Sequence, residues 1–287
     1  MATSPEEISK KYHTVIEATN PWKPFDLTEI FRYKDFFYYK IVNGYKAQQK
    51  QSVLGYFWVV FDPAFSILFY SLVFGAVAQI ATGDVPYVIF NATAVLGWTY
   101  LSGCMNNATS SMQANAGIIQ KVYFPRIYVP LVPCIIALPN FFINFVLILI
   151  LMASFGFFPG IQILAIIPIM LIMITFSMGL GLLITTFKLQ YRDLGRVWGY
   201  FMRFYAYAVP MAYPVTAITE QFPDKEWIYT VYMLNPAAPL IEGFRGALLG
   251  TYIPWTYIGI SFLVSVVLLY VGAVVFRLRE PNIVDAL

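Results

Sequence analysis

Six long apolar stretches, separated by short polar segments, constrain this chain more than any other feature of its sequence. They cover residues 54–79, 86–108, 127–153, 162–187, 198–216 and 255–276. A helix needs about 20 consecutive apolar residues to cross the hydrocarbon core of a bilayer, and each stretch has about that length. Only 11% of the residues are charged, against about 25% in soluble domains. The sequence therefore predicts an all-α integral membrane protein with six transmembrane helices within residues 51–287. It excludes soluble enzymes and nucleic-acid-binding proteins.

The positive charges predict how these helices are oriented. With six spans, both termini lie on the same side of the membrane. The sequence has 18 Lys and Arg residues. All of them fall on that side apart from Lys225 and Arg245, which lie in the last outer loop. Because cytoplasmic segments of membrane proteins carry the excess of Lys and Arg, both termini are expected in the cytoplasm.

Two shorter segments have helical patterns but are not predicted to cross the membrane. After an N-terminal tail at residues 1–25, residues 26–50 place apolar side chains mostly on one face. This pattern predicts an amphipathic helix in the cytoplasmic interface, with Asp26 and Glu29 as a capping pair. A frayed polar tail is the alternative. Residues 236–250 of the last outer loop are apolar but too short to cross, which predicts a re-entrant element.

Titratable and nucleophilic groups are scarce inside the apolar stretches. The single histidine, His13, lies in the polar N-terminal tail, and Cys104 and Cys134 have the character of small buried apolar residues. Asp62 is the one acid well inside a stretch. Because Pro63 follows it, it marks a kink or the cytoplasmic boundary of the first span. No GxxxxGK[ST] phosphate-binding loop occurs. We therefore expect no catalytic residue, metal site or cofactor in this chain.

Aromatic side chains are abundant in the first and fifth stretches and recur at helical spacing. Those that we select are Trp58, Phe61, Phe65, Phe69, Tyr200, Phe204 and Tyr207. Such stripes face lipid, pack against other helices, or offer sugar rings a surface that is apolar yet able to form hydrogen bonds. The residues alone favour packing.

Four short segments follow one another in a recognisable order and spacing. They are KQSVLGYFW at 50–58 followed by Asp62-Pro63, KVYFPR at 121–126, YRDL at 191–194, and NP at 235–236 with PLIE at 239–242 and FR at 244–245. From about residue 26 to the C-terminus, the chain resembles the membrane subunit of type-2 ABC exporters for cell-surface polysaccharides. That family handles O-antigen, capsule and teichoic-acid chains.

The resemblance implies a homodimer in a bacterial inner (plasma) membrane, in which each copy is docked on a separate cytoplasmic ATP-binding subunit. The two ATP-binding subunits would hold ATP and Mg, and the cargo would be a lipid-linked polysaccharide. In such proteins the pathway lies at the dimer interface and is lined by spans 1, 2 and 5, which favours a sugar-stacking role for the aromatic stripes.

The resemblance also implies roles for three further sets of residues. The inner loop 113–126 would contact the ATP-binding subunit through Lys121, Tyr123, Phe124 and Arg126. A second contact would be made by Tyr191, Arg192 and Asp193. The re-entrant element would close the outer end of the pathway through Pro236, Glu242 and Arg245. Glu242 and Arg245 are three residues apart and can pair on one helical face; an ordinary exposed ion pair on a loop is the alternative.

Two other function classes remain open on sequence alone. One is a type-2 ABC exporter for drugs or lipids. The other is a polytopic membrane enzyme, such as a protease or a lipid-sugar transferase, which would need a nucleophile–base pair or a carboxylate cluster at the membrane edge. The outer acids Glu220, Asp224 and Glu226 are more typical of a solvated loop.

Overall fold

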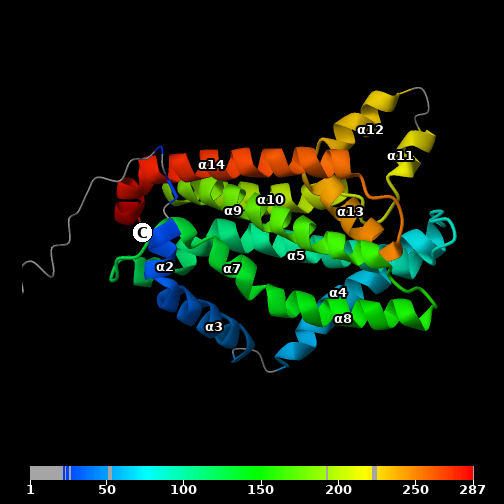
Figure 1. Ribbon diagram of the computed structural model, residues 1–287, viewed down its shortest axis with the longest axis horizontal. Helices are drawn as coiled ribbons and strands as arrows, with labels where there is room; N and C mark the ends of the chain where they lie inside the picture. Colours follow the sequence, from blue (N-terminus) through cyan, green and yellow to red (C-terminus); the bar gives the residue numbers. More distant parts are fainter. Residues whose placement is uncertain are drawn as a thin grey trace, which may run out of the picture.

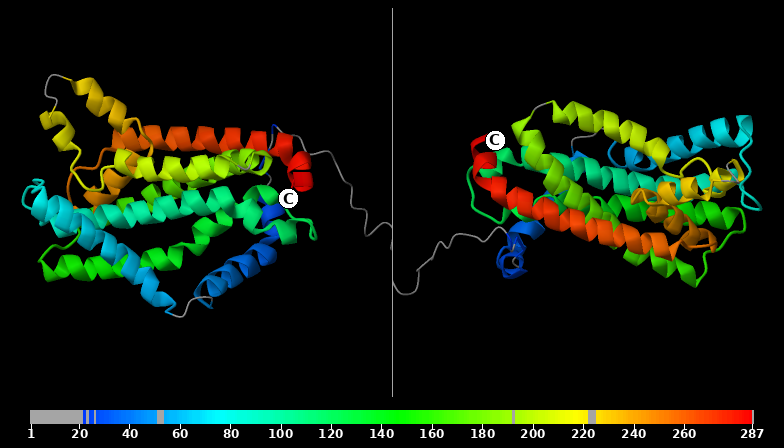
Figure 2. Two further views of the ribbon diagram at one scale, coloured as in Figure 1. Left: turned by 180° about the vertical axis from the view of Figure 1, so that it is seen from behind. Right: turned by 90° about the horizontal axis from the view of Figure 1, so that it is seen from above.

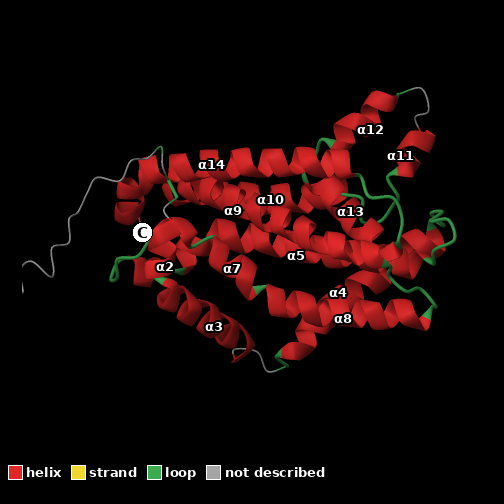
Figure 3. Ribbon diagram, viewed as in Figure 1, coloured by secondary structure: helices red, strands yellow, loops and turns green. Residues whose placement is uncertain are grey.

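The computed structural model describes residues 22, 24–25, 27–50, 54–191, 193–221 and 225–286, and in these residues the regular secondary structure is entirely helical (Figure 3). In chain order the helices are α2 (Leu27–Arg32), α3 (Lys34–Lys50), α4 (Tyr56–Tyr70), η1 (Ser71–Val77), α5 (Tyr87–Ala114), α6 (Ala116–Ile119), η2 (Arg126–Tyr128), α7 (Leu131–Ile136), α8 (Leu138–Ser154), η3 (Ile161–Ala165), α9 (Ile166–Gln190), α10 (Leu194–Tyr205), η4 (Ala206–Ala208), α11 (Thr216–Gln221), α12 (Glu226–Met233), α13 (Ala237–Leu249) and α14 (Trp255–Ala286).

The long helices form one elongated bundle whose two ends differ (Figure 1). Helices α2 and α3 and the last turns of α14 lie at one end, whereas α11 and α12 project from the other. We call these the inner and outer ends, following the orientation that the positive charges predict. Helix α2 and the C-terminal turns of α14 therefore lie at the same end of the bundle (Figure 1).

Five segments of the described chain are long and apolar enough to cross a membrane. They are Tyr56–Val77, Tyr87–Ala114, Arg126–Ser154, Ile161–Gln190 and Trp255–Glu280. Each overlaps one of the expected stretches, and the boundaries differ by at most six residues. The prediction of an all-α protein with long apolar helices is confirmed.

The stretch 198–216 differs from its expectation, because it is not one long helix. Helix α10 and the single turn η4 end together at Ala208, and no further helix begins before Thr216. Pro210 and Pro214 lie in this gap, and proline cannot continue a helix without losing a backbone hydrogen bond. The 15 helical residues from Leu194 to Ala208 span about 22 Å, which is short of the ~30 Å of a hydrocarbon core. The chain still passes from the inner to the outer end here, since α9 ends near α2 and α11 lies at the far end (Figure 1).

Pro63 lies inside α4 without interrupting it. A proline has no N–H to donate to the carbonyl four residues earlier, here that of Val59. Asn144 of α8 donates its side-chain N–H to this oxygen at 3.0 Å. One turn later, Asn91 of α5 donates to the Ile67 carbonyl at 3.2 Å, just before the chain widens into the π-helix η1. Asp62 is exposed within α4, so the helix begins before the proline and not after it.

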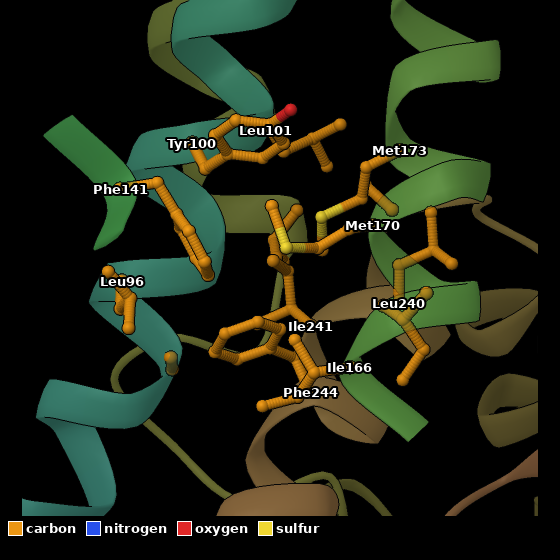
Figure 4. Close-up of a cluster of buried hydrophobic side chains, with 14 of the residues drawn as sticks. Leu96, Tyr100, Leu101, Phe141, Ile166, Met170, Met173, Leu240, Ile241 and Phe244 are labelled. Atoms are coloured by element: carbon orange, nitrogen blue, oxygen red, sulfur yellow. The ribbon is translucent and has the colours of Figure 1, made fainter. Parts of the chain in front are cut away.

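The core lies where α5, α8, α9 and α13 meet. Figure 4 shows its side chains, which include Leu96, Tyr100, Leu101, Phe141, Ile166, Met170, Met173, Leu240, Ile241 and Phe244. Helices α9 and α14 also approach closely, because a Cβ added at Gly179 would lie 2.6 Å from the backbone nitrogen of Leu269. In a bilayer such contacts stabilise through close packing, since lipid tails are as apolar as the side chains themselves.

Helix α13, in the segment 236–250 that is expected to be re-entrant, is short and almost completely buried. Eleven of its side chains and glycines, from Ala237 to Leu248, are buried. Asn235 accepts a hydrogen bond from the backbone N–H of Ala237 at 3.3 Å, and Gly250 ends the helix in the left-handed conformation with φ 70°.

The expected helix at residues 26–50 is present as two helices, α2 and α3, separated at Tyr33. Phe36 and Phe37 of α3 pack against the bundle, whereas Tyr38 and Tyr39 are exposed. The expected capping residue Asp26 and nearly all of the N-terminal tail lie outside the described residues.

Candidate functional site

The aromatic residues selected in α4 lie on the surface of this chain. Trp58, Phe61, Phe65 and Phe69 are all at least 40% exposed, and the rings of Phe61 and Phe65 stack with their centroids 5.9 Å apart. The interpretation that this stripe packs within the chain is therefore wrong. Its rings remain available to lipid, to a second copy or to a substrate.

The selected residues of α10 and η4 are also exposed, and the structure explains their orientation. Trp198 is buried and donates a hydrogen bond to the side chain of Asn106 in α5 at 3.0 Å. Two turns later, Tyr205 donates to Asn235 at 2.6 Å. These bonds hold one face of α10 against the bundle, so Tyr200 and Phe204 point outward, where both are at least 60% exposed.

The two aromatic surfaces lie on one side of the bundle. Seen from behind, α4 and α10 both face the viewer and α5 runs between them (Figure 2, left). Tyr207, which follows α10, is 71% exposed. Sequence reasoning missed Asn106 and, although it noted Asn235 in the NP motif, missed that both residues fix this geometry. Asn106 could have been noticed because it is a polar residue within an apolar stretch.

Arg245 forms a buried centre at the outer end. Its side chain is 2% exposed, and it forms a 2.7 Å ion pair with Glu242. Its second terminal nitrogen donates to the backbone oxygen of Pro210 and, at 3.4 Å, to that of Met211. The guanidinium also lies 3.8 Å from the centroid of the Phe90 ring. The alternative of an ordinary exposed ion pair is wrong, because Arg245 ties α13 to the non-helical segment that follows η4.

The four residues selected in the inner loop differ in how far they are exposed to solvent. Lys121 and Tyr123 are exposed, and the Tyr123 side chain is 69% accessible. Phe124 is buried, with its ring centroid 4.5 Å from that of Phe36. Arg126 is 15% exposed and lies 3.6 Å from Glu280 of α14. In this conformation Phe124 and Arg126 therefore connect the loop to α3 and α14, and only Lys121 and Tyr123 are free to reach a partner. The expectation that Phe124 enters a partner's groove is corrected, since its own chain already surrounds it.

The residues expected to make a second inner contact lie in the turn between α9 and α10. Tyr191 and Asp193 are both exposed there, and Asp193 lies 3.6 Å from Arg196 on the same turn. Arg192 lies outside the described residues. Both inner turns, at residues 120–126 and 191–194, lie at the same end of the bundle as α2 (Figure 1).

No metal-binding arrangement occurs among the described residues, where no three His, Cys, Asp or Glu side chains come together. Cys104 and Cys134 are both buried free thiols. The polar side chains described above, Asn106, Asn235 and Arg245, hold helices together through their hydrogen bonds.

Comparison with known proteins identifies related chains. The family model described as ABC-2 type transporter matches residues 37–249. A Klebsiella pneumoniae protein named O-antigen export system permease protein RfbA is 28% identical over 254 residues, which is 88% of this chain and 92% of that protein. A Myxococcus xanthus protein of the same name is 23% identical, covering 90% of this chain and 98% of its own length. The Escherichia coli polysialic acid transport protein KpsM is 20% identical, covering 79% of this chain and 86% of that protein.

Proposed function

This chain belongs to the ABC-2 type transporter family, and from that premise we propose that it is the transmembrane subunit of an ATP-driven exporter for a lipid-linked polysaccharide. Two copies would form the pathway in a bacterial inner membrane with their termini in the cytoplasm. Each copy would be driven by a separate ATP-binding subunit that holds ATP and Mg. The main support is that relatives named as O-antigen export permeases align over nearly the full length of both chains.

The exposed aromatic side of the bundle supports a role in carrying sugars. The rings on α4 and those on α10 and η4 are not needed to fill this chain's own core. Tyr and Trp combine an apolar ring with a hydrogen-bonding group, a combination that suits a surface over which sugar units slide. In the proposed dimer the two aromatic sides face each other and line the pathway.

The inner turns support coupling to the ATP-binding subunit. Lys121, Tyr123, Tyr191 and Asp193 are exposed at the inner end. Next to them, Phe124 packs on α3 and Arg126 pairs with Glu280. A push on the inner loop would therefore reach both the interface helix and the last spanning helix. In this proposal Pro236, Glu242 and Arg245 belong to the element that closes the outer end.

Reconstitution in vesicles with the ATP-binding subunit tests this proposal. We expect a lipid-linked glycan to stimulate ATP turnover and to appear on the far side of the membrane. Phe65→Ala or Tyr207→Ala removes one ring contact of about 0.5–1.5 kcal/mol, so export should slow by about 2- to 10-fold with an unchanged amount of folded dimer. Phe158→Ala, at another exposed ring outside the aromatic surfaces, is the matched control.

Two results would contradict the proposal. If export and folded dimer fall together in the aromatic variants, these rings have a structural role and do not line a sugar pathway. If drugs or simple lipids stimulate ATP turnover while lipid-linked glycans do not, the cargo belongs to another class.

A further inference from the structure

A cavity of about 480 Å³ lies on the inner half of the bundle, between α3, α5, α7 and α8. This volume is within the range of about 300–1,000 Å³ that is usual for small-molecule sites. The cavity shares no residue with the aromatic surfaces or with the Arg245 centre, and of the inner loop 113–126 only Ala114 and Asn115 line it. The roles proposed for the exposed rings, for Lys121 and Tyr123 and for Arg245 therefore do not account for this cavity.

The wall of the cavity changes from apolar to polar along α5. Eight residues of this helix line it, from Leu96 to Ala114, on one helical face that is about 27 Å long. Near Leu96 the α5 side of the wall is mainly apolar, and the rings of Tyr100 and Phe141 meet there with centroids 5.2 Å apart. Toward the inner end α5 contributes Asn107, Ser110 and Ser111, and Asn115 follows directly after the helix. A ligand that matches this wall has a polar head and a hydrocarbon tail.

The polar part of the cavity carries positive charge. Lys40 of α3 lines it, is half-buried and has no carboxylate within ion-pair distance among the described residues. Burial lowers the pKa of Lys40, so a nearby anion would stabilise its charged form. Behind the wall, the buried Lys188 donates a hydrogen bond to Ser110 at 3.0 Å. No acidic residue is among those that line the cavity, so the head that fits is anionic.

Two further features of the cavity wall suit a bound ligand: a hydrogen-bond acceptor without a partner in the described residues, and free space beside a glycine. The side-chain oxygen of Asn140, another lining residue, is buried and accepts no hydrogen bond from the described part of the chain. Gly103 faces open space, because a Cβ added there would meet no atom within 4 Å. Glycine weakens the interior of a helix relative to alanine. The wall therefore has room for a larger group at Gly103.

We propose that this cavity binds an anionic phospholipid of the inner leaflet, with the phosphate near Lys40 and an acyl chain along Leu96, Tyr100 and Phe141. The location fits such a ligand, because an interface helix and spanning helices meet where head groups and hydrocarbon adjoin. The anionic lipids of the cytoplasmic leaflet attract lysines at this level. This inference does not depend on the proposed cargo, and its test uses no transport.

Native mass spectrometry of the purified chain tests the charge requirement. The chain is equilibrated in micelles with equal parts of phosphatidylglycerol and phosphatidylcholine, and the retained lipids are counted. We expect retention of phosphatidylglycerol over phosphatidylcholine. Lys40→Gln should lower that preference about fivefold, the effect of one lysine near an anionic surface. Lys46→Gln, at an exposed lysine on the same helix, should leave the preference unchanged. Equal preference in the wild type, or equal effects of the two substitutions, would overturn the proposal.

A second pair of variants tests the location. Gly103→Leu fills the cavity, and we expect it to lower the retention of both lipids while the thermal unfolding midpoint stays within a few degrees. Gly259→Leu makes the same change on α14, where the added side chain also meets open space, and should retain lipid like the wild type. Unchanged retention in Gly103→Leu would place the lipid elsewhere. If added polyprenyl phosphate displaces phosphatidylglycerol from the wild type but not from Lys40→Gln, the site belongs to a lipid carrier and the proposal is wrong.

Discussion

Replacing Asn144 by leucine tests how α4 tolerates a proline in its interior. Asn144 is 9% exposed, and its side-chain nitrogen lies 3.0 Å from the carbonyl oxygen of Val59. Pro63 cannot donate to that oxygen, so Asn144 supplies the N–H that α4 lacks. Asn144→Leu keeps a similar volume and removes the donor. It leaves a carbonyl in a water-poor environment without this partner.

The expected loss of stability follows from the cost of an unpaired carbonyl. Leaving a buried acceptor unsatisfied costs about 1–3 kcal/mol, whereas interhelical hydrogen bonds in membrane proteins average about 0.6 kcal/mol and reach about 1.7 kcal/mol. We therefore expect Asn144→Leu to lower the free energy of unfolding by about 1–2 kcal/mol. In a Pro63→Ala background the alanine N–H pairs with Val59, so the same change should cost about 0.5 kcal/mol or less.

Equilibrium unfolding in mixed micelles of increasing denaturing detergent measures all four proteins of this cycle. Asn91→Leu is the matched control, because Asn91 donates to Ile67, a carbonyl that Pro63 does not deprive of its partner. The changes that Asn91→Leu and Pro63→Ala make in the free energy of unfolding should therefore be additive. If Asn144→Leu costs the same with and without the proline, Asn144 does not compensate for Pro63 and the reasoning is refuted.

Two further predictions concern the outer and inner ends. Arg245→Met should lower the free energy of unfolding by about 3–5 kcal/mol, because it leaves Glu242 without its cation and frees the segment after η4; an unchanged thermal midpoint would show that the ion pair holds nothing together. Phe124→Ala should lower the free energy of unfolding by about 3–5 kcal/mol, because it removes the ring that packs against Phe36. Tyr123→Ala should leave the thermal unfolding midpoint unchanged and weaken binding of the ATP-binding subunit. The reverse pattern in unfolding and pull-down experiments would contradict the assigned roles of the two rings.

The spanning helices were predictable because their signal is local. An apolar run of about 20 residues has few alternatives in a bilayer, where backbone groups must pair within the segment. The length and apolar composition of residues 236–250 likewise predicted a short element that does not cross, but they did not predict that α13 is almost completely buried. The end of α10 was missed, although Pro210 and Pro214 are visible in the sequence, because 198–216 reads as one apolar run.

The site residues were harder to interpret because exposure is not a local property. Phe124 lies in an inner loop next to Lys121, which suggested an accessible ring. Its burial depends on Phe36, which is almost 90 residues away in the chain. The residues of the α4 stripe alone favour packing, and the family resemblance favours a sugar-stacking role; only the positions of the neighbouring helices show that the rings are uncovered in this chain.

By itself, the sequence determined the class of the protein, the positions of its long helices and its expected orientation. These depend on the apolar runs and on the placement of Lys and Arg, and both are properties of the sequence that do not change with the fold. The tertiary structure alone decided which polar side chains support the bundle. Arg245 reaches carbonyls 34 and 35 residues earlier in the chain, and Asn144 reaches one 85 residues earlier. Such pairs form because a buried polar group must find a partner, and the packing of the helices decides which partner is close enough.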